Sequence, residues 1–434
     1  MVSKKLFGFI TVFLLLFRVA LPSHNASRYF PFLERPESVV TRGESHIYPS
    51  LFITSASTAF KRGGGNTGIP ELWGKYDLKD VIEGVEAVKL AQGAASYNPF
   101  AAEVGYVDWN KKEVKFAIDG KIKSQGFILG IEQRLFKTDF SFGCFIPLMH
   151  VNSSLRFNFD SENSHADVKS ATTQEQDMLD RVRRSVHAEL ALKGSDWSDS
   201  GFGDIDLHLR WRHLWDHVLK MKTIDFNLQA GLTCPTGVKS EKDYPSSVPF
   251  MGNGHWGAYF DLVTELELKQ NWRLGLMAGL VEQFKKTHNT RIPYYKEPAI
   301  FSALHGNVEI NPGITLKLSP YFTLENLTDG LHFQLRYSFL RHSADSWKDV
   351  RADKTVASYL SLEKSDITAV RAEKNALSKW TSHYLSMQLI YDSTEAMKNW
   401  FWKPTLYAIY DHPMAGRGMC KTHQFSVGVE FHPF

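Results

Sequence analysis

Between Gly203 and Phe284 the chain alternates, residue by residue, between apolar and polar side chains in four successive runs. In the first run Leu207 and Leu209 alternate with Asp206 and His208. A period of two indicates a β-strand with two different faces. The runs cover about 10–13 residues, the length that a tilted strand needs to cross a bilayer, whereas strands of soluble proteins are usually about 5–6 residues long. Period and length together favour a membrane-spanning sheet.

The polar face of these runs carries full charges, such as Arg210 and Asp261, and aromatic residues gather toward the strand ends. These aromatic residues are Trp211, Trp215, Trp256, Tyr259 and Trp272. An apolar outer face, a polar inner face and aromatic girdles are typical of a transmembrane β-barrel. The alternative is a large soluble β-protein, which buries one apolar face and exposes the other face to water.

The N-terminus has the pattern of a secretory signal. Lys4 and Lys5 precede an apolar run from Leu6 to Leu16, which is too short for a comfortable membrane span. We expect a signal peptide over residues 1–26 and a single barrel over residues 27–434. An exported chain with amphipathic strands enters a membrane only as a closed barrel, because an open sheet edge leaves backbone groups unpaired in lipid. The expected location is the outer membrane of a Gram-negative-type bacterium.

Strand candidates recur along the whole chain. They are His46–Ser57, Glu103–Trp109, Val114–Asp119, Phe127–Phe136, Phe140–Phe157, Ile205–Trp215, Ile224–Leu232, Trp256–Leu268, Trp272–Leu280, Asn307–Leu318, Leu331–Arg341, His383–Asp392, Phe401–Asp411 and His423–Phe434. Short and longer connections alternate between them, as in bacterial barrels with short periplasmic turns and an even strand number. We therefore expect an all-β fold, a transmembrane antiparallel up-and-down β-barrel of about 14 strands (12–16) with helical loop insertions.

One long connection, Ser161–Ser200, contains a helical pattern. Its apolar residues recur every four positions from Met178 to Leu190, which predicts an amphipathic helix. Thr173 and Gln176 resemble a capping box at the start, and Gly194 ends the run. The helix is expected either to cover the barrel mouth as a solvated lid or to fold inward as a constriction.

Two stretches resemble known outer-membrane proteins. The C-terminal FSVGVEFHPF resembles the sorting signal that the barrel-assembly machinery reads, although Phe431 and Phe434 lie three apart around Pro433 and share a face only with a bulge or a frayed end. The segment from Ser200 to Thr236, with SGFGDIDLHLRWRHL and FNLQAGLTCPTG, is similar to outer-membrane transporters of aromatic hydrocarbons and fatty acids. That resemblance implies a fourteen-stranded barrel.

The segment GIPELWGKYDL, together with the cysteines, resembles outer-membrane proteins of chlamydia-like bacteria, in which disulfides contribute to wall rigidity and a porin-like role is implied. The chain has 3 cysteines, so at least one has no partner within the chain. Cys144 fits a small apolar residue on a lipid-facing surface. Cys234 and Cys420 lie at loop-like positions and are the candidates for a disulfide, including one to an envelope partner.

A barrel of this size has a lumen wider than side chains alone can fill. The predicted pore-lining residues share the polar face of the strands: Asp206, His208, Arg210, Arg212, Asp225, Asp261, Glu265, Arg273 and Arg336. Basic and acidic walls that face each other would orient polar solutes and screen ions by charge. The expected function is a porin-like outer-membrane channel for passive diffusion of small polar or amphipathic solutes. The alternative is a structural or adhesive surface protein whose barrel is plugged.

Other classes of function find little support. The formal net charge of +3 and the lack of a basic block argue against nucleic-acid binding. His213 and His217 have a metal-ligand spacing that suits a helix, but they lie at a strand end. The chain has no GxSxG, HExxH or P-loop motif, so we expect neither an enzyme nor a cofactor. The expected partners are outer-membrane lipid, the barrel-assembly machinery and small solutes.

Overall fold

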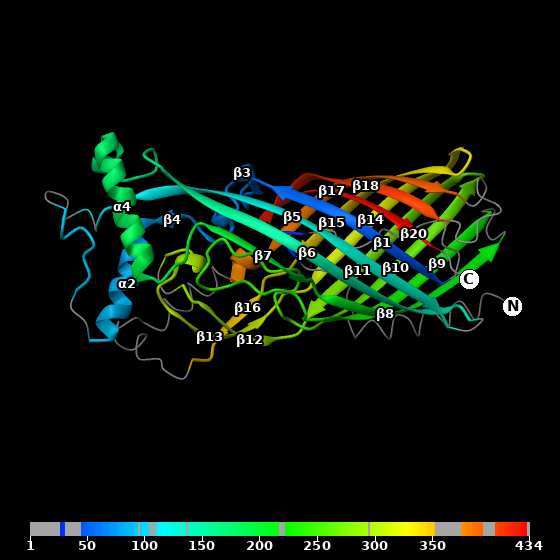
Figure 1. The fold of residues 1–434 in the computed structure, drawn as a ribbon, viewed down its shortest axis with the longest axis horizontal. Coiled ribbons are helices and arrows are strands. Elements are labelled where there is room, and N and C mark those ends of the chain that lie inside the picture. The colour runs from blue at the N-terminus through cyan, green and yellow to red at the C-terminus, as the bar shows by residue number, and fades with distance from the viewer. Residues whose placement is uncertain are drawn as a thin grey trace.

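The chain folds into an elongated β-barrel with a loop-rich cap at one end (Figure 1). The computed structural model describes residues 27–30, 45–93, 96–103, 109, 111–135, 138–216, 222–293, 296–351, 375–393 and 404–431. The predicted signal peptide, residues 1–26, therefore lies outside the described residues. In the part of the chain that is described, no helix is long and apolar enough to span a membrane.

Twelve antiparallel strands form the barrel wall, in the order β10-β11-β14-β15-β17-β18-β20-β1-β5-β6-β8-β9. They are β1 (His46–Ala56), β5 (Lys115–Arg134), β6 (Phe140–Phe159), β8 (Ile205–Asp216), β9 (Thr223–Cys234), β10 (Gly257–Lys269), β11 (Trp272–Gln283), β14 (Thr315–Thr328), β15 (Leu331–His342), β17 (Trp380–Asp392), β18 (Thr405–Arg417) and β20 (His423–Glu430). The two ends of this order, β9 and β10, lie against each other, so the barrel is closed.

The predicted period-two pattern sorts the side chains as expected. Outward residues such as Leu51 and Trp272 are 58% and 51% exposed, while their neighbours along each strand are mostly buried inside. Trp215 and Trp256 are also among the exposed aromatics, as the girdle prediction requires. Tyr259 differs, because it points to the inner face and is buried. The closed, apolar-coated barrel is that of an outer-membrane protein.

The strand count is 12, at the lower end of the expected range, because two of the fourteen predicted strands are one and Glu103–Trp109 is not among the twelve. Val114–Asp119 and Phe127–Phe136 belong to the single 20-residue strand β5. Around Lys121 and Lys123, the polar side chains of β5 point outward and the apolar side chains point inward. In the following part of the strand most apolar side chains point outward. The apolar residues therefore switch from one alternating set of positions to the other, although the strand itself is continuous. The predicted strand Glu103–Trp109 falls largely on 104–108, outside the described residues.

Connections differ between the two ends of the barrel. The pairs β10–β11 and β14–β15 are joined at residues 270–271 and 329–330, at what we call the turn end. The opposite end, which we call the loop end, carries the long connections, including 235–256 and 284–314. β1 begins at the turn end and β20 finishes there, where Ile47 pairs with Phe431. The predicted alternation of short and long connections holds from β1 to β17. It fails for the last two connections, because residues 393–404 join β17 to β18 at the turn end and the shorter 418–422 joins β18 to β20 at the loop end. Pro433 and Phe434 lie outside the described residues.

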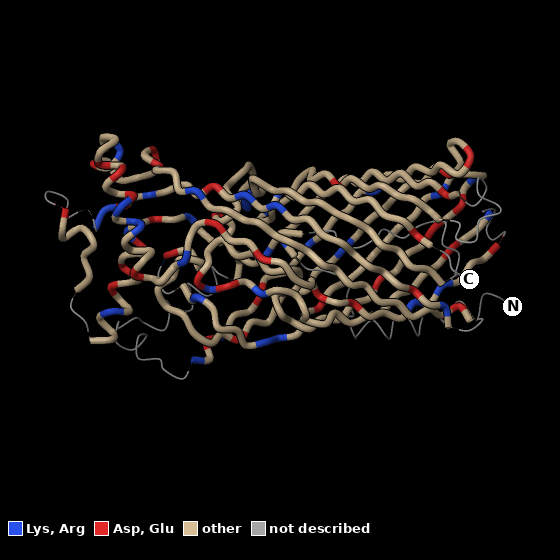
Figure 2. The backbone as a smooth tube through the Cα atoms, in the orientation of Figure 1, with Lys and Arg blue, Asp and Glu red and all other residues tan. Residues whose placement is uncertain are grey.

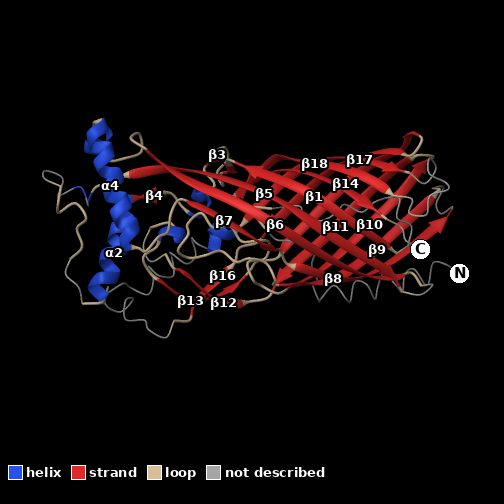
Figure 3. Ribbon diagram, in the orientation of Figure 1, coloured by secondary structure: helices blue, strands red, loops and turns tan. Residues whose placement is uncertain are grey.

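Helices and small sheets gather at the loop end (Figure 3). The helices are η1 (Pro70–Trp73), α2 (Leu78–Ala91), α3 (Ala166–Lys169), α4 (Thr173–Glu189) and η3 (Ala299–Phe301). One small sheet consists of β12 (Lys286–Arg291), β13 (His305–Asn311) and β16 (Ser346–Asp349), and another of β19 (Met419–Cys420), β2 (Ala59–Phe60) and β3 (Asn66–Thr67). Two further strands extend the barrel sheet, β4 (Tyr76–Asp77) beside β5 and β7 (Asp196–Phe202) beside β6.

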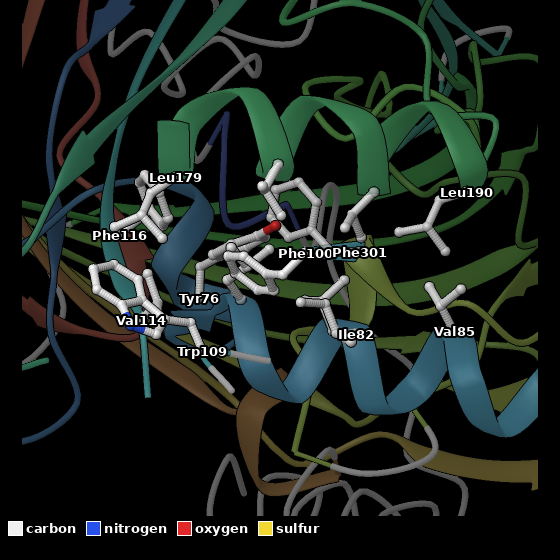
Figure 4. Close-up of a cluster of buried hydrophobic side chains, with 14 of the residues drawn as sticks. Tyr76, Ile82, Val85, Phe100, Trp109, Val114, Phe116, Leu179, Leu190 and Phe301 are labelled. Atoms are coloured by element: carbon white, nitrogen blue, oxygen red, sulfur yellow. The ribbon is translucent and has the colours of Figure 1, made fainter. Parts of the chain in front are cut away.

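The predicted amphipathic helix is α4, and it packs with α2 over an apolar cluster (Figure 4). Its buried face includes Leu179 and Val182, and the far ends of β5 and β6 supply aromatic residues to the same cluster. The capping box uses Thr172 and Glu175, one residue earlier than expected. Because α4 covers this cluster beyond the barrel, it does not fold inward as a constriction.

Candidate functional site: the inner wall of the barrel

All nine predicted pore-lining residues lie on the inner face of the wall. The strands β8, β9, β10, β11 and β15 bring them together because each strand turns alternate residues inward. Most are buried, with Asp206 only 1% exposed. Figure 2 shows charged residues of both signs along the strands as well as in the loops.

The basic residues of the inner wall are held by acids on nearby strands. Arg210 Nη1 lies 2.8 Å from Glu132 Oε2, and Arg210 Nη2 donates to Gln229 Oε1 at 2.9 Å. Arg212 Nε donates to Asp225 Oδ1 at 3.0 Å. These contacts join β8 to β5 and to β9, and they run along the wall.

Two further arginines repeat this arrangement. Arg273 lies 2.9 Å from both Glu265 on β10 and Glu325 on β14. Arg336 on β15 lies 3.6 Å from Asp411 on β18, with one strand between them. The expected picture of a basic wall facing an acidic wall therefore differs from the structure. Each arginine is neutralised by an acid one or two strands away along the wall, because buried charges are stable only with close partners.

His208 and Asp206 belong to a buried hydrogen-bond chain. His208 Nδ1 lies 2.7 Å from Asp206 Oδ1, and the Tyr259 hydroxyl donates to the same oxygen at 2.9 Å. Gln229 Nε2 donates to the Tyr259 hydroxyl at 3.0 Å. These hydrogen bonds connect β8, β9 and β10, where the contact between β9 and β10 closes the barrel. They fix these side chains against the wall.

The sequence prediction missed several charged residues of the same face. Among the described strands, the buried or half-buried acids of the inner face are Glu132, Asp206, Asp225, Asp261, Glu265, Glu267, Glu325, Asp392, Asp411 and Glu430, and the buried or half-buried bases are Arg210, Arg212, Arg273, Lys317 and Arg336. Strand parity applied to β5, β10, β14, β17, β18 and β20 would have found the additional members. Acids outnumber bases on this face.

Aromatic rings on the inner face lie flat over glycines of the neighbouring strand. A Cβ built on Gly275 would lie 2.0 Å from the Tyr321 ring, and one on Gly130 would lie 2.0 Å from the Tyr48 ring. Because glycine has no side chain, each ring can pack directly against the backbone of the neighbouring strand. The rings therefore occupy less of the lumen than their size suggests.

Residues 27–30 close part of the loop end. Arg28 Nη2 donates to the backbone oxygens of Leu377 and Ser378 at 2.9 and 2.6 Å, and its guanidinium stacks 4.4 Å from the Trp73 ring. The Tyr29 hydroxyl accepts a bond from Trp73 Nε1 at 3.0 Å. A cavity of about 160 Å³ lies beside Tyr29 and Trp73, under the loops.

The inner wall is tightly covered in this conformation. Ser338 and Ser382 are both 0% exposed, although they face inward on β15 and β17. Larger side chains of the inner wall therefore cover these two serines.

The cysteines differ in accessibility. Cys144 points outward on β6 between apolar residues, as predicted for a lipid-facing position. Cys234 is half-buried at the loop end of β9. Cys420 is fully buried, and burial raises the pKa of its thiol to about 12. A buried thiol with a raised pKa is a poor nucleophile, so these surroundings disfavour the disulfide predicted for Cys420. The disulfide predicted for Cys234 stays a prediction.

Metal and catalytic candidates remain isolated. Among the described residues, no group of three or more His, Cys, Asp or Glu side chains is placed to hold a metal ion. His213 Nδ1 lies 2.8 Å from Asp139 Oδ2, and its sequence neighbour in the predicted pair, His217, lies outside the described residues.

No family model matches the chain, and no curated protein matches it. Among solved structures, an outer membrane channel from Pseudomonas putida F1 has a TM-score of 0.48 and 9% identity, over 92% of this chain and 99% of that chain. A Pseudomonas aeruginosa FadL homologue has a TM-score of 0.34 and 10% identity, over 90% and 91% of the two chains. The β domain of the Bordetella autotransporter BrkA has a TM-score of 0.36 and 8% identity, over 90% and 99%. All three TM-scores are below 0.5, and all three identities are 10% or lower.

Proposed function

We propose that this protein is an outer-membrane channel that passes small polar or amphipathic solutes by passive diffusion. The observation that carries the proposal is a charged and polar inner wall inside an apolar-coated, closed barrel. A protein that served only as a scaffold would fill its interior more stably with apolar side chains, because burying charges costs free energy. Transport of this kind needs no cofactor and no covalent step.

The inner wall supports a preference for cations. Acids outnumber bases there, and four of the bases are arginines held by neighbouring carboxylates. Fixed acids in a confined lumen of low dielectric attract cations more strongly than they would in bulk water. We propose that the loop end faces the cell exterior, that lipid surrounds the apolar belt, and that the assembly machinery recognises β20.

A structural or adhesive role with a plugged barrel is the second candidate. It is favoured by the burial of the inner wall and by the anchoring of residues 27–30 at the loop end. In that case α2, α4 and the loops would contact an envelope partner, with Cys234 as the accessible thiol. The two candidates differ in whether the lumen ever opens.

Liposome swelling separates the candidates. Vesicles containing the refolded protein are diluted into isotonic sugars and amino acids of increasing size. The channel proposal predicts swelling that falls with solute size, and faster swelling for Arg28→Ala, because Arg28 ties residues 27–30 to Leu377 and Ser378. Arg184→Ala, at a side chain that is 65% exposed on α4, is the matched control and should behave like the natural protein. Equal impermeability of all three proteins would reject the channel and favour the plugged barrel.

A further inference from the structure

Two histidine side chains meet at the loop end, away from the inner wall. His255 lies just before β10, and His288 lies on β12. Their Nε2 atoms are 3.0 Å apart, and the ring planes are tilted by 46°. His255 is only 4% exposed, whereas His288 is half-buried. We propose that this pair is a two-imidazole site for a divalent first-row transition metal ion, with Cu²⁺ bound most tightly.

The distance suits two ligands of one metal ion. Imidazole nitrogens bind such ions at about 2.0–2.1 Å, so two nitrogens at angles of 90–110° around one ion lie about 2.9–3.4 Å apart. The observed separation of 3.0 Å lies within that range. A small rotation of the rings directs both lone pairs at one ion, which lies beside the line between the two Nε2 atoms.

The backbone sets the orientation of His255. Its Nδ1–H donates to the Phe284 carbonyl at 2.8 Å, so Nε2 carries the lone pair. This outer hydrogen bond is of the kind that fixes the tautomer and ring angle of metal-binding histidines. With no metal, His288 Nε2–H donates to that lone pair. Metal binding replaces this hydrogen bond. The His288 proton moves from Nε2 to Nδ1 through solvent, so Nε2 gains a lone pair while the ring stays neutral and no net proton is released.

The surrounding charges decide the affinity. Burial lowers the pKa of His255, and burial together with His255 and the nearby lysines lowers the pKa of His288 to about 4. Both rings are therefore neutral at pH 7 and ready to bind. Lys286, which donates to the Gly254 carbonyl at 2.9 Å, and Lys239 oppose a cation, whereas Asp345 favours one. Water completes the coordination, and the order of affinities follows Cu²⁺ above Zn²⁺ and Ni²⁺.

Calorimetric titration of the folded full-length protein with Cu²⁺ tests the site. We expect one binding event that is weakened at least tenfold in His288→Gln and in His255→Gln, and unchanged in His305→Gln, an exposed histidine of the neighbouring strand β13. Lys239→Gln should tighten the event, because it removes a nearby positive charge.

Two results would overturn the proposal. One is a Cu²⁺ affinity that is the same in the natural protein and in His288→Gln, which would place any binding elsewhere. The other is no stoichiometric binding by the natural protein, which would make the pair a structural hydrogen bond. His288 is the decisive position because it is half-buried, so its substitution leaves the fold intact even if His255→Gln fails to fold.

Discussion

At the scale of single residues, the inner wall depends on pairs of side chains that lie one or two strands apart. Tyr321 lies over Gly275, and its hydroxyl donates to Glu265 Oε2 at 3.0 Å. Glu265 in turn pairs with Arg273. The glycine therefore positions an aromatic ring, a carboxylate and a guanidinium against the wall.

Replacing that glycine tests the arrangement. In Gly275→Val the new side chain would overlap the Tyr321 ring, where a Cβ already lies 2.0 Å away. The ring must move into the lumen and release Glu265. We expect the variant to lose about 1–3 kcal/mol of stability and to have a smaller conductance. The loss is seen as a lower temperature at which the protein changes from its folded to its unfolded mobility on a gel. Gly63→Val, with nothing within 4 Å of its Cβ, is the control. Identical behaviour of the two variants would refute this role for Gly275.

The alternation of apolar and polar residues along each strand was enough to predict which residues face inward, as Asp206, Arg210 and Arg336 show. It could not predict their partners. Glu132 meets Arg210 across the intervening strand β6, and Asp411 meets Arg336 across β17. Such pairs depend on the register between strands that are distant in sequence, and a single sequence carries no direct signal of register.

At the scale of elements, β5 and β6 extend beyond the barrel and carry the layer formed by α2 and α4. There the inward face is apolar and the outward face is polar, the reverse of the membrane belt. That reversal explains why one long strand was predicted as two. The helix α4 was predictable because its apolar residues keep a helical period and its start carries a capping box.

This layer contains a histidine that is sensitive to acid. His187 lies 2.9 Å from the Tyr76 hydroxyl, and burial, with the charge of Arg183, lowers its pKa to about 3. The unfolded chain takes up a proton near pH 6.5, so the contribution of His187 to stability is complete above that pH and falls as the pH drops toward 3. At pH 5 the loss is about 2 kcal/mol.

Hydrogen exchange of the α4 amides measures this effect. We expect exchange in the natural protein to accelerate between pH 7 and pH 5, after correction for the intrinsic rate, and His187→Phe to lose most of that dependence. His165→Gln, at an exposed histidine before α3, should keep the natural dependence. A His187→Phe protein with the full acid response would show that other groups cause it.

At the scale of the whole molecule, one end of the barrel carries the loops and the other carries the short turns. Bacterial barrels of this kind place short turns in the periplasm. In a protein whose three cysteines are replaced by serine, Thr287→Cys on β12 should react with an impermeant maleimide in intact cells. Asp329→Cys at the turn end should react only after permeabilisation. The opposite labelling would invert the proposed orientation.

The central claim is that the charged inner wall conducts, and single-channel recording in a planar bilayer tests it most directly. Discrete conductance steps with a preference for cations are expected from the natural protein. A variant with both Arg210→Glu and Arg212→Glu, which reverses two of the wall's fixed positive charges, should be more strongly cation-selective. Two results would contradict the account. One is a fully folded, heat-modifiable barrel that produces no conductance steps. The other is an ion selectivity that is the same in the natural protein and in the variant.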